Sequence, residues 1–228
     1  RQGGKRQSNL EPFRPILFSW AGRNELRSLT AAESNGHNVV LTRQYLLSGL
    51  YVNELMLRLC HREDPHPELF RVYEHTLSAL ALLSQQTLFM QQPTGNHAHS
   101  SSKAASIEEQ KLLRLFEKRL LNAIGYGLYL DRDVETGLPI NENNTYCYML
   151  EQGPILSRQV AESGTSVMIT GRSLQALAQE DLNDMLVLRE IKQLMRAALD
   201  MHLGGRSLDS RHLRQSFEQI KLQRNHKT

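Results

Sequence analysis

Residues 106–127 read SIEEQKLLRLFEKRLLNAIGYG, and their apolar side chains recur every three or four positions. Ser106 followed three residues later by Glu109 has the spacing of a capping box, which is typical of a helix start. Gly125-Tyr126-Gly127 is typical of a helix end. The apolar stripe between them consists of Leu112, Leu113, Leu115, Phe116, Leu120, Leu121 and Ile124. The stretch therefore predicts an amphipathic helix that packs against other helices.

The same period occurs on both sides of this helix. Before it, helices are expected over about 42–61, with Thr42 as N-cap, and about 69–89, separated by Asp64-Pro65-His66-Pro67. Gly49 lies on the apolar stripe of the first of these, where it lets a neighbouring element approach closely. The polar residues 91–105 predict a mobile loop. After it, helices are expected at about 171–178, 184–203 and 210–221.

Two other regions have strand character. Phe13 to Trp20, the turn residues 21–24, and Leu26 to Ala31 predict a hairpin. The glycine-rich and proline-rich residues 129–166, which contain the alternating run 145–150, predict a small strand-rich insertion. The fold class is therefore α+β and mainly α, with a helical body interrupted by a β insertion and preceded by strands.

The composition excludes several classes. The chain has 228 residues, 40% of them hydrophobic, which is enough for one main core. No apolar run is long enough to span a bilayer and no signal peptide is present, so we expect a cytoplasmic protein. Cys60 and Cys147 share no short spacing, and a disulfide framework or a four-cysteine zinc site is not predicted. The net charge is +3, with both ends of the chain basic, which favours anionic partners.

A first candidate site is the basic and aromatic N-terminal stretch. Lys5, Arg6 and Arg14 lie close in sequence to aromatic residues that could stack on bases, while the cations contact phosphate. The aromatic residues are Phe13, Phe18 and Trp20. The alternative is a solvated loop beside aromatic residues that face a core.

A second candidate is Arg114, because an arginine beside an apolar groove suits an acidic and hydrophobic peptide end. The alternative is an ordinary helix-surface arginine. For Glu108, Glu109 and Glu117, surface ion pairs at helical spacing are the preferred interpretation. His61 and His66 near Cys60 do not complete a metal site, and a polar helix end explains them.

No catalytic motif is present, which favours binding over catalysis. A nuclease is a third alternative, and Asp131, Asp133 and Glu135 are its only support in the sequence.

Four motifs in register resemble the RecO family of bacterial DNA-repair proteins. They are SNLEPF at 8–13, YLLSGLYVNEL at 45–55, LRLFEKRLLNAIGYG at 113–127 and LGGRSLDSR at 203–211. The resemblance implies an N-terminal OB-fold, a helical domain and a zinc-ribbon-like insertion within it. The chain starts with Arg1, so we expect only the later OB-fold strands. Cys147 stands alone in the insertion, so neither zinc nor any other cofactor is expected.

The resemblance also divides the chain into four parts. These are a partial OB-fold (1–38), the first part of the helical domain (39–128), the β insertion (129–168) and the second part of the helical domain (169–228).

The function implied by the resemblance is that of a non-enzymatic recombination mediator, cytoplasmic and associated with the nucleoid. It binds single-stranded and double-stranded DNA, anneals complementary strands, binds the C-terminal tail of single-stranded-DNA-binding protein, and with RecR helps to load RecA. The residues implied in DNA binding are Lys5, Arg6, Arg14, Arg23 and Arg27. Those implied in binding the tail are Leu113, Arg114, Phe116 and Arg189. The alternative is a helical adaptor that binds only repair proteins.

Overall fold

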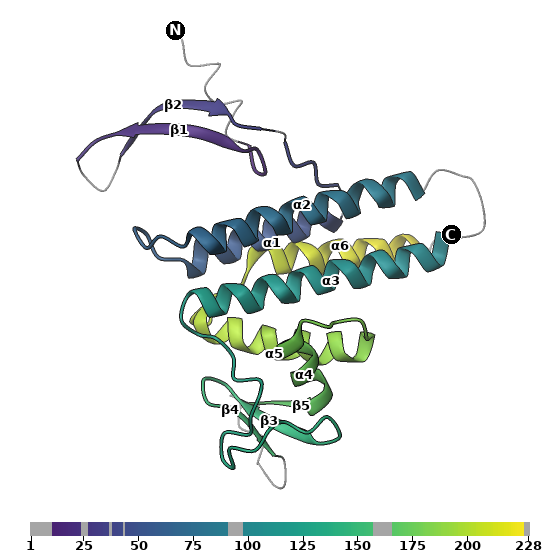
Figure 1. Cartoon of the computed structure of the whole chain (residues 1–228). Coiled ribbons are helices and arrows are strands. Elements are labelled where there is room, and N and C mark those ends of the chain that lie inside the picture. The colour runs from purple at the N-terminus through teal and green to yellow at the C-terminus, as the bar shows by residue number, and fades with distance from the viewer. Residues whose placement is uncertain are drawn as a thin grey trace.

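The computed structural model describes residues 11–23, 27–36, 38–42, 44–90, 98–156 and 166–225. A body of packed helices has a two-stranded sheet on one side and a three-stranded sheet on the other (Figure 1). The helices described are α1 (Gln44–Leu59), α2 (Pro67–Met90), α3 (Ala98–Ala123), α4 (Gly171–Gln179), α5 (Met185–His202) and α6 (Asp209–Asn225). The strands described are β1 (Ile16–Ala21), β2 (Ser28–Ser34), β3 (Thr145–Met149), β4 (Gly153–Leu156) and β5 (Ser166–Thr170).

Helix α3 is central to the body, since it contacts α1, α2 and α5. Its stripe of Phe116, Leu120 and Leu121 is almost fully buried. Val52 of α1 and Ile191 of α5 are equally inaccessible in the same core. The predicted apolar periodicity therefore corresponds to the buried faces of the helices. Among the described residues, no helix is long and apolar enough to cross a membrane.

The start of α3 differs from the prediction. Residues 98–105, expected to belong to a loop, are helical, and residues 91–97 lie outside the described part of the chain. Alanine is the strongest helix former, and adding residues to an existing helix costs far less than starting one, so the helix extends upstream. Ser106 is consequently inside the helix and is not its N-cap, and the predicted capping box with Glu109 is wrong.

The N-terminal hairpin is confirmed. Strands β1 and β2 pair antiparallel, with Ile16 opposite Ser34 and an irregularity after Ser19. The close approach predicted at Gly49 is confirmed as well, because a Cβ there would overlap Cδ1 of Leu41 and lie 2.9 Å from the ring of Phe13. Membership of the hairpin in an OB-fold stays a prediction.

The insertion contains the antiparallel sheet β4-β3-β5, in which Cys147 is buried. Asp133 organises the loop before this sheet, since its carboxylate accepts backbone N–H bonds from Glu135, Thr136 and Leu156 at 2.9, 2.8 and 2.7 Å. These bonds commit the Asp133 oxygens to the backbone. Asp131, Asp133 and Glu135 were the only support for a nuclease. This support is lost, because the carboxylate of Asp133 is bonded to the loop backbone.

Helix α6 is attached to α1 through one carboxylate. Glu54 accepts the backbone N–H of Asp209 at 3.0 Å, and the backbone N–H and hydroxyl of Ser210 at 2.9 and 2.6 Å. It thus caps the α6 N-terminus from another helix. Partial burial acts to raise the pKa of Glu54, but the bonds from Ser210 and Asp209 outweigh burial and hold this pKa below its usual value.

We predict that Glu54→Gln lowers the free energy of unfolding by about 1–2 kcal/mol, because an amide cannot accept all of these bonds. Since the Glu54 pKa is lower in the folded state, its contribution is complete above the unfolded pKa of about 4.3 and is lost as pH falls through the folded pKa. Urea unfolding at pH 7 and at low pH measures both effects. The exposed Glu74→Gln is the control, and an equal loss in both variants would refute the capping role.

Candidate functional site

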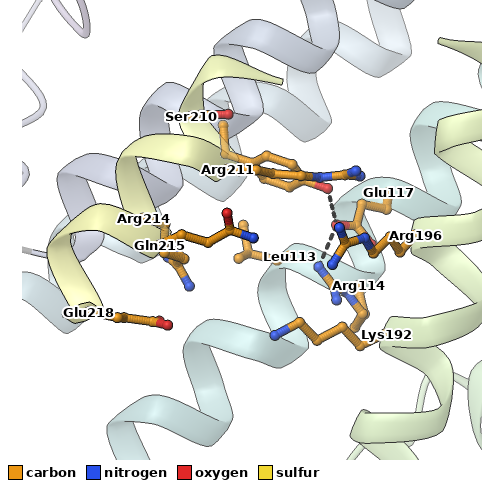
Figure 2. Close-up of a pocket in the computed structure, with 11 residues that line it drawn as sticks. Leu113, Arg114, Glu117, Lys192, Arg196, Ser210, Arg211, Arg214, Gln215 and Glu218 are labelled. Atoms are coloured by element: carbon orange, nitrogen blue, oxygen red, sulfur yellow. Dashed lines mark hydrogen bonds and ion pairs between the residues drawn. The ribbon is translucent and has the colours of Figure 1, made fainter. Parts of the chain in front are cut away.

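A pocket of about 210 Å³ lies where α3, α5 and α6 meet, with Tyr51 of α1 also in its wall. Side chains from the three helices reach the same space in Figure 2. The lining side chains are Tyr51, Leu113, Arg114, Glu117, Lys192, Arg196, Ser210, Arg211, Arg214, Gln215 and Glu218. Five of them are cationic and two are carboxylates, so the pocket favours an anionic ligand.

The inner wall is a hydrogen-bonded group of three residues. Tyr51 donates its hydroxyl to Oε1 of Glu117 at 2.6 Å, and the Arg114 guanidinium donates to the same oxygen. The Arg114 and Glu117 side chains are only 8% and 1% exposed. Burial raises the pKa of Glu117, although Arg114 and Tyr51 act in the opposite direction. Burial and the Glu117 carboxylate raise the pKa of Tyr51, which therefore keeps its proton and acts as the donor.

Two buried polar atoms of this group have no hydrogen-bond partner among the described residues. They are Nε of Arg114 and Oε2 of Glu117. Leaving a buried polar atom unpaired costs about 1–3 kcal/mol. Arg114 lines the pocket, but its Nε is buried and its Nη2 already donates to Glu117, so an acceptor that enters the pocket reaches Nε only when the Arg114 side chain moves.

The outer wall carries the remaining cations. Arg214 is held by buried Glu109 at 2.8 Å, and Arg211 is paired with Asp200 while its guanidinium lies 5.9 Å from the ring centre of Tyr51. Burial lowers the pKa of Lys192, and the positive charges of Arg114 and Arg214 lower it further. Lys192 thus feels an excess of positive charge, which an anion would relieve.

The residues predicted for peptide binding divide into two groups. Leu113 and Arg114 line the pocket, whereas Phe116 is buried in the core and exposed Arg189 of α5 is not among the lining residues. Arg114 is not a helix-surface arginine, because it is only 6% exposed. Most of the residues that line the pocket beside it are charged, although apolar atoms supply the larger part of the pocket surface.

The interpretation as surface ion pairs at helical spacing is confirmed for Glu108, which lies 3.9 Å from Lys111. It is wrong about the surface for Glu109 and Glu117, because both are buried, although Glu117 does pair with Arg114 at helical spacing.

Glu109 accepts hydrogen bonds from Gln44, Ser48 and Arg214, and so joins α3 to α1 and α6. The partners of Glu109 and Glu117 on α1 and α6 are far away in the sequence, and local helical spacing cannot reveal such contacts.

The predicted DNA-binding residues cluster only in part. Lys5 and Arg6 lie outside the described residues. Arg23 is exposed, and Arg14 lies 3.3 Å from a Glu11 oxygen. Arg27 is near the exposed ring of Trp20, with its guanidinium 5.9 Å from the ring centre, and 3.5 Å from Glu63.

The hairpin aromatic residues are not core residues. Phe18 and Trp20 are 49% and 52% exposed, and their ring centres are 5.3 Å apart. Phe13 is the exception, since it packs against the core at Gly49. The hairpin thus places the exposed rings of Phe18 and Trp20 near the cation of Arg27, a combination that suits binding of single-stranded nucleic acid.

The sequence interpretation missed most of the pocket. Lys192 and Arg196 on α5, and Arg211 and Arg214 on α6, are cationic residues at helical spacing that line it. That spacing was a usable signal, but only the packing shows that both cationic faces turn toward Arg114. Within the part of the chain that the structure describes, no group of three His, Cys, Asp or Glu residues could hold a metal ion.

We predict that Arg114→Met destabilises the protein by about 3–5 kcal/mol, because it leaves the Glu117 carboxylate buried without its cation. Removal of both charges in Arg114→Met/Glu117→Leu should restore most of this stability. In the single variant the raised Glu117 pKa makes the loss larger at pH 8 than at pH 5, since protonation removes the buried charge.

Chemical denaturation at both pH values measures these differences, with Arg119→Met on the same helix as the exposed control. Additive losses in the double variant would contradict the coupling of Arg114 to Glu117.

Comparison with known proteins places the chain in a family. Residues 41–89 and 103–212 match the family described as Recombination protein O C terminal. The chain is 43% identical to the DNA repair protein RecO of Alkalilimnicola ehrlichii over 204 residues, which cover 90% of this chain and 71% of that protein. It is 40% identical to RecO of Nitrosococcus oceani, covering 96% and 79% of the two chains, and 37% identical to RecO of Coxiella burnetii, covering 91% and 78%. The chain therefore belongs to the RecO family of DNA repair and recombination proteins.

Proposed function

We propose that this protein acts in DNA repair by binding, without catalysis, two kinds of anionic ligand at separate surfaces. The pocket between α3, α5 and α6 takes the acidic C-terminal tail of single-stranded-DNA-binding protein, and the hairpin β1-β2 contributes to binding of single-stranded and double-stranded DNA. Annealing of complementary strands, and loading of RecA together with RecR, complete the proposal and rest on the resemblance to the family.

The unpaired Nε of Arg114, a residue that lines a cationic pocket, is the observation that carries the proposal. A peptide carboxylate offers two oxygens in one plane, which matches the donors on one edge of a guanidinium. Lys192 and Arg196 add positive charge for acidic side chains that precede the terminus. Leu113 and the Tyr51 ring supply the apolar contact that an aromatic or aliphatic terminal residue needs.

The hairpin supports the DNA part of the proposal in a different way. Trp20 and Phe18 offer exposed ring faces for unstacked bases, and Arg27 and Arg23 offer charge for phosphates. Contacts of this kind carry little sequence information and weaken with salt. The hairpin is thus suited to binding DNA of any sequence.

We predict that Lys192→Gln weakens binding of a labelled tail peptide about five- to tenfold, because a charge-assisted contact is lost. Arg189→Gln, on the same helix but not lining the pocket, should change the affinity less than twofold. Fluorescence anisotropy with the free-acid peptide and its C-terminal amide measures both effects. Equal weakening by the two substitutions, or equal binding of the two peptides, would place the tail elsewhere.

For DNA, Trp20→Ala should weaken single-stranded binding by about 1–3 kcal/mol and duplex binding less, because only unpaired bases stack on the ring. Arg27→Gln should weaken both and lower the salt dependence by about one counterion. Anisotropy titrations at several salt concentrations measure this, with Arg71→Gln on α2 as the control. Tail binding without salt-sensitive DNA binding would favour the protein-only adaptor instead.

A further inference from the structure

We infer that Glu117 is a built-in competitor in the pocket, which occupies Arg114 until an anionic ligand replaces it. The inference rests on the proposed function, since it concerns how the same pocket admits an acidic peptide. It assigns to Glu117 control over the affinity and over the uptake of a proton on binding.

The pairing of Glu117 with Arg114 leaves half of each group unused. A matched pair of arginine and carboxylate uses two N–H donors and two oxygens. Here Oε1 of Glu117 receives both Arg114 and Tyr51, while Oε2 of Glu117 and Nε of Arg114 have no partner among the described residues. An entering carboxylate that bonds in bidentate fashion would therefore satisfy Arg114 better than Glu117 does.

Glu117 is held by donors from two helices, Tyr51 of α1 and Arg114 of α3. Tyr51, on α1, donates to Glu117 at 2.6 Å, whereas Arg114 lies beside Lys192 in the pocket wall (Figure 2). Arg114 can thus turn toward a ligand while Tyr51 retains Glu117. Exchange of the partner of Arg114 then needs rotation of one side chain and no movement of a helix.

Loss of Arg114 changes the charge balance of Glu117. Burial already raises the Glu117 pKa, and Arg114 is the main group that opposes this rise. After exchange, Glu117 is buried beside a neutral tyrosine and takes a proton from solvent, so that up to one proton enters with each peptide. The charged and titratable groups that face the site are Tyr51, Arg114, Lys192, Arg196, Arg211, Arg214 and Glu218.

Lys192 is another group on this wall whose pKa a bound anion would change. Burial, Arg114 and Arg214 lower its pKa, and a bound anion reverses that effect, which also takes up a proton. A larger fraction of Lys192 is protonated at lower pH, so measurement at pH 6.5 reduces its contribution relative to measurement at pH 8.

The test is the affinity of the tail peptide for the whole chain with Glu117→Gln, and with Glu218→Gln as the matched control. Both substitutions remove one negative charge from the pocket wall, but only Glu117 is paired with Arg114. We expect Glu117→Gln to bind about five- to tenfold more tightly than the wild type, and Glu218→Gln to bind only about twofold more tightly, because it removes a repulsive charge without releasing Arg114.

Calorimetry at pH 6.5, in buffers of different ionisation enthalpy, counts the protons taken up. We expect proton uptake and tighter binding as pH falls from 8 to 6 in the wild type, and clearly smaller effects in Glu117→Gln, where only Lys192 contributes. The wild-type measurement depends on no variant, so it tests the inference even if Glu117→Gln folds poorly.

Each outcome is decisive. Equal or weaker binding by Glu117→Gln, or the same proton uptake in both proteins, overturns the inference and leaves the proposed function intact. Binding by Glu117→Gln but not by the wild type supports the competitor role and refutes tail binding by the native pocket. Absence of peptide binding in both the wild type and Glu117→Gln overturns the inference and the proposed function together, because a released Arg114 would then have created no anion site.

Discussion

Attachment of α6 to α1 and α3 through the carboxylates of Glu54 and Glu109 is the constraint on which the pocket depends. Glu54 caps the first turn of α6, and one turn further along Glu109 receives Arg214 at 2.8 Å. These two contacts fix both the position and the rotation of α6, because they engage residues four positions apart on one face. Arg211 and Glu218 then turn toward α5 and close the pocket. Without this attachment α3 and α5 would present an open face.

The same chemistry explains why the pocket is both costly and suited to binding. A buried ion pair rarely repays its desolvation unless its hydrogen bonds are complete, and the pair of Arg114 and Glu117 is incomplete on both sides. An apolar pair of similar size would avoid this desolvation cost. An unpaired donor at the wall of a cationic pocket is, however, what an anionic ligand needs. Stability is lower at the place where a partner would contribute the missing bonds.

The helical body was largely predictable from the sequence, because burial of one face imposes its period on the residues. The expected helix at 42–61 and the observed α1 (Gln44–Leu59) differ by two residues at either end. The start of α3 was not predictable, because Ser106 and Glu109 have the spacing of a cap while Glu109 in fact bonds to Ser48, 61 residues away. Arg114 could be singled out in the sequence. The cations opposite it could not, since only the packing of α5 and α6 brings them there.

Helix α1 separates the two proposed binding surfaces. Gly49 contacts Phe13, which precedes the hairpin, while Tyr51 forms part of the pocket wall. Residues two positions apart in an α-helix point about 200° away from each other around its axis. The side of α1 that contacts Phe13 is therefore opposite the side that reaches the pocket, and no residue is shared by the two surfaces. A DNA strand on the hairpin and an acidic peptide in the pocket need not compete for space, so a protein of this shape can hold both at once.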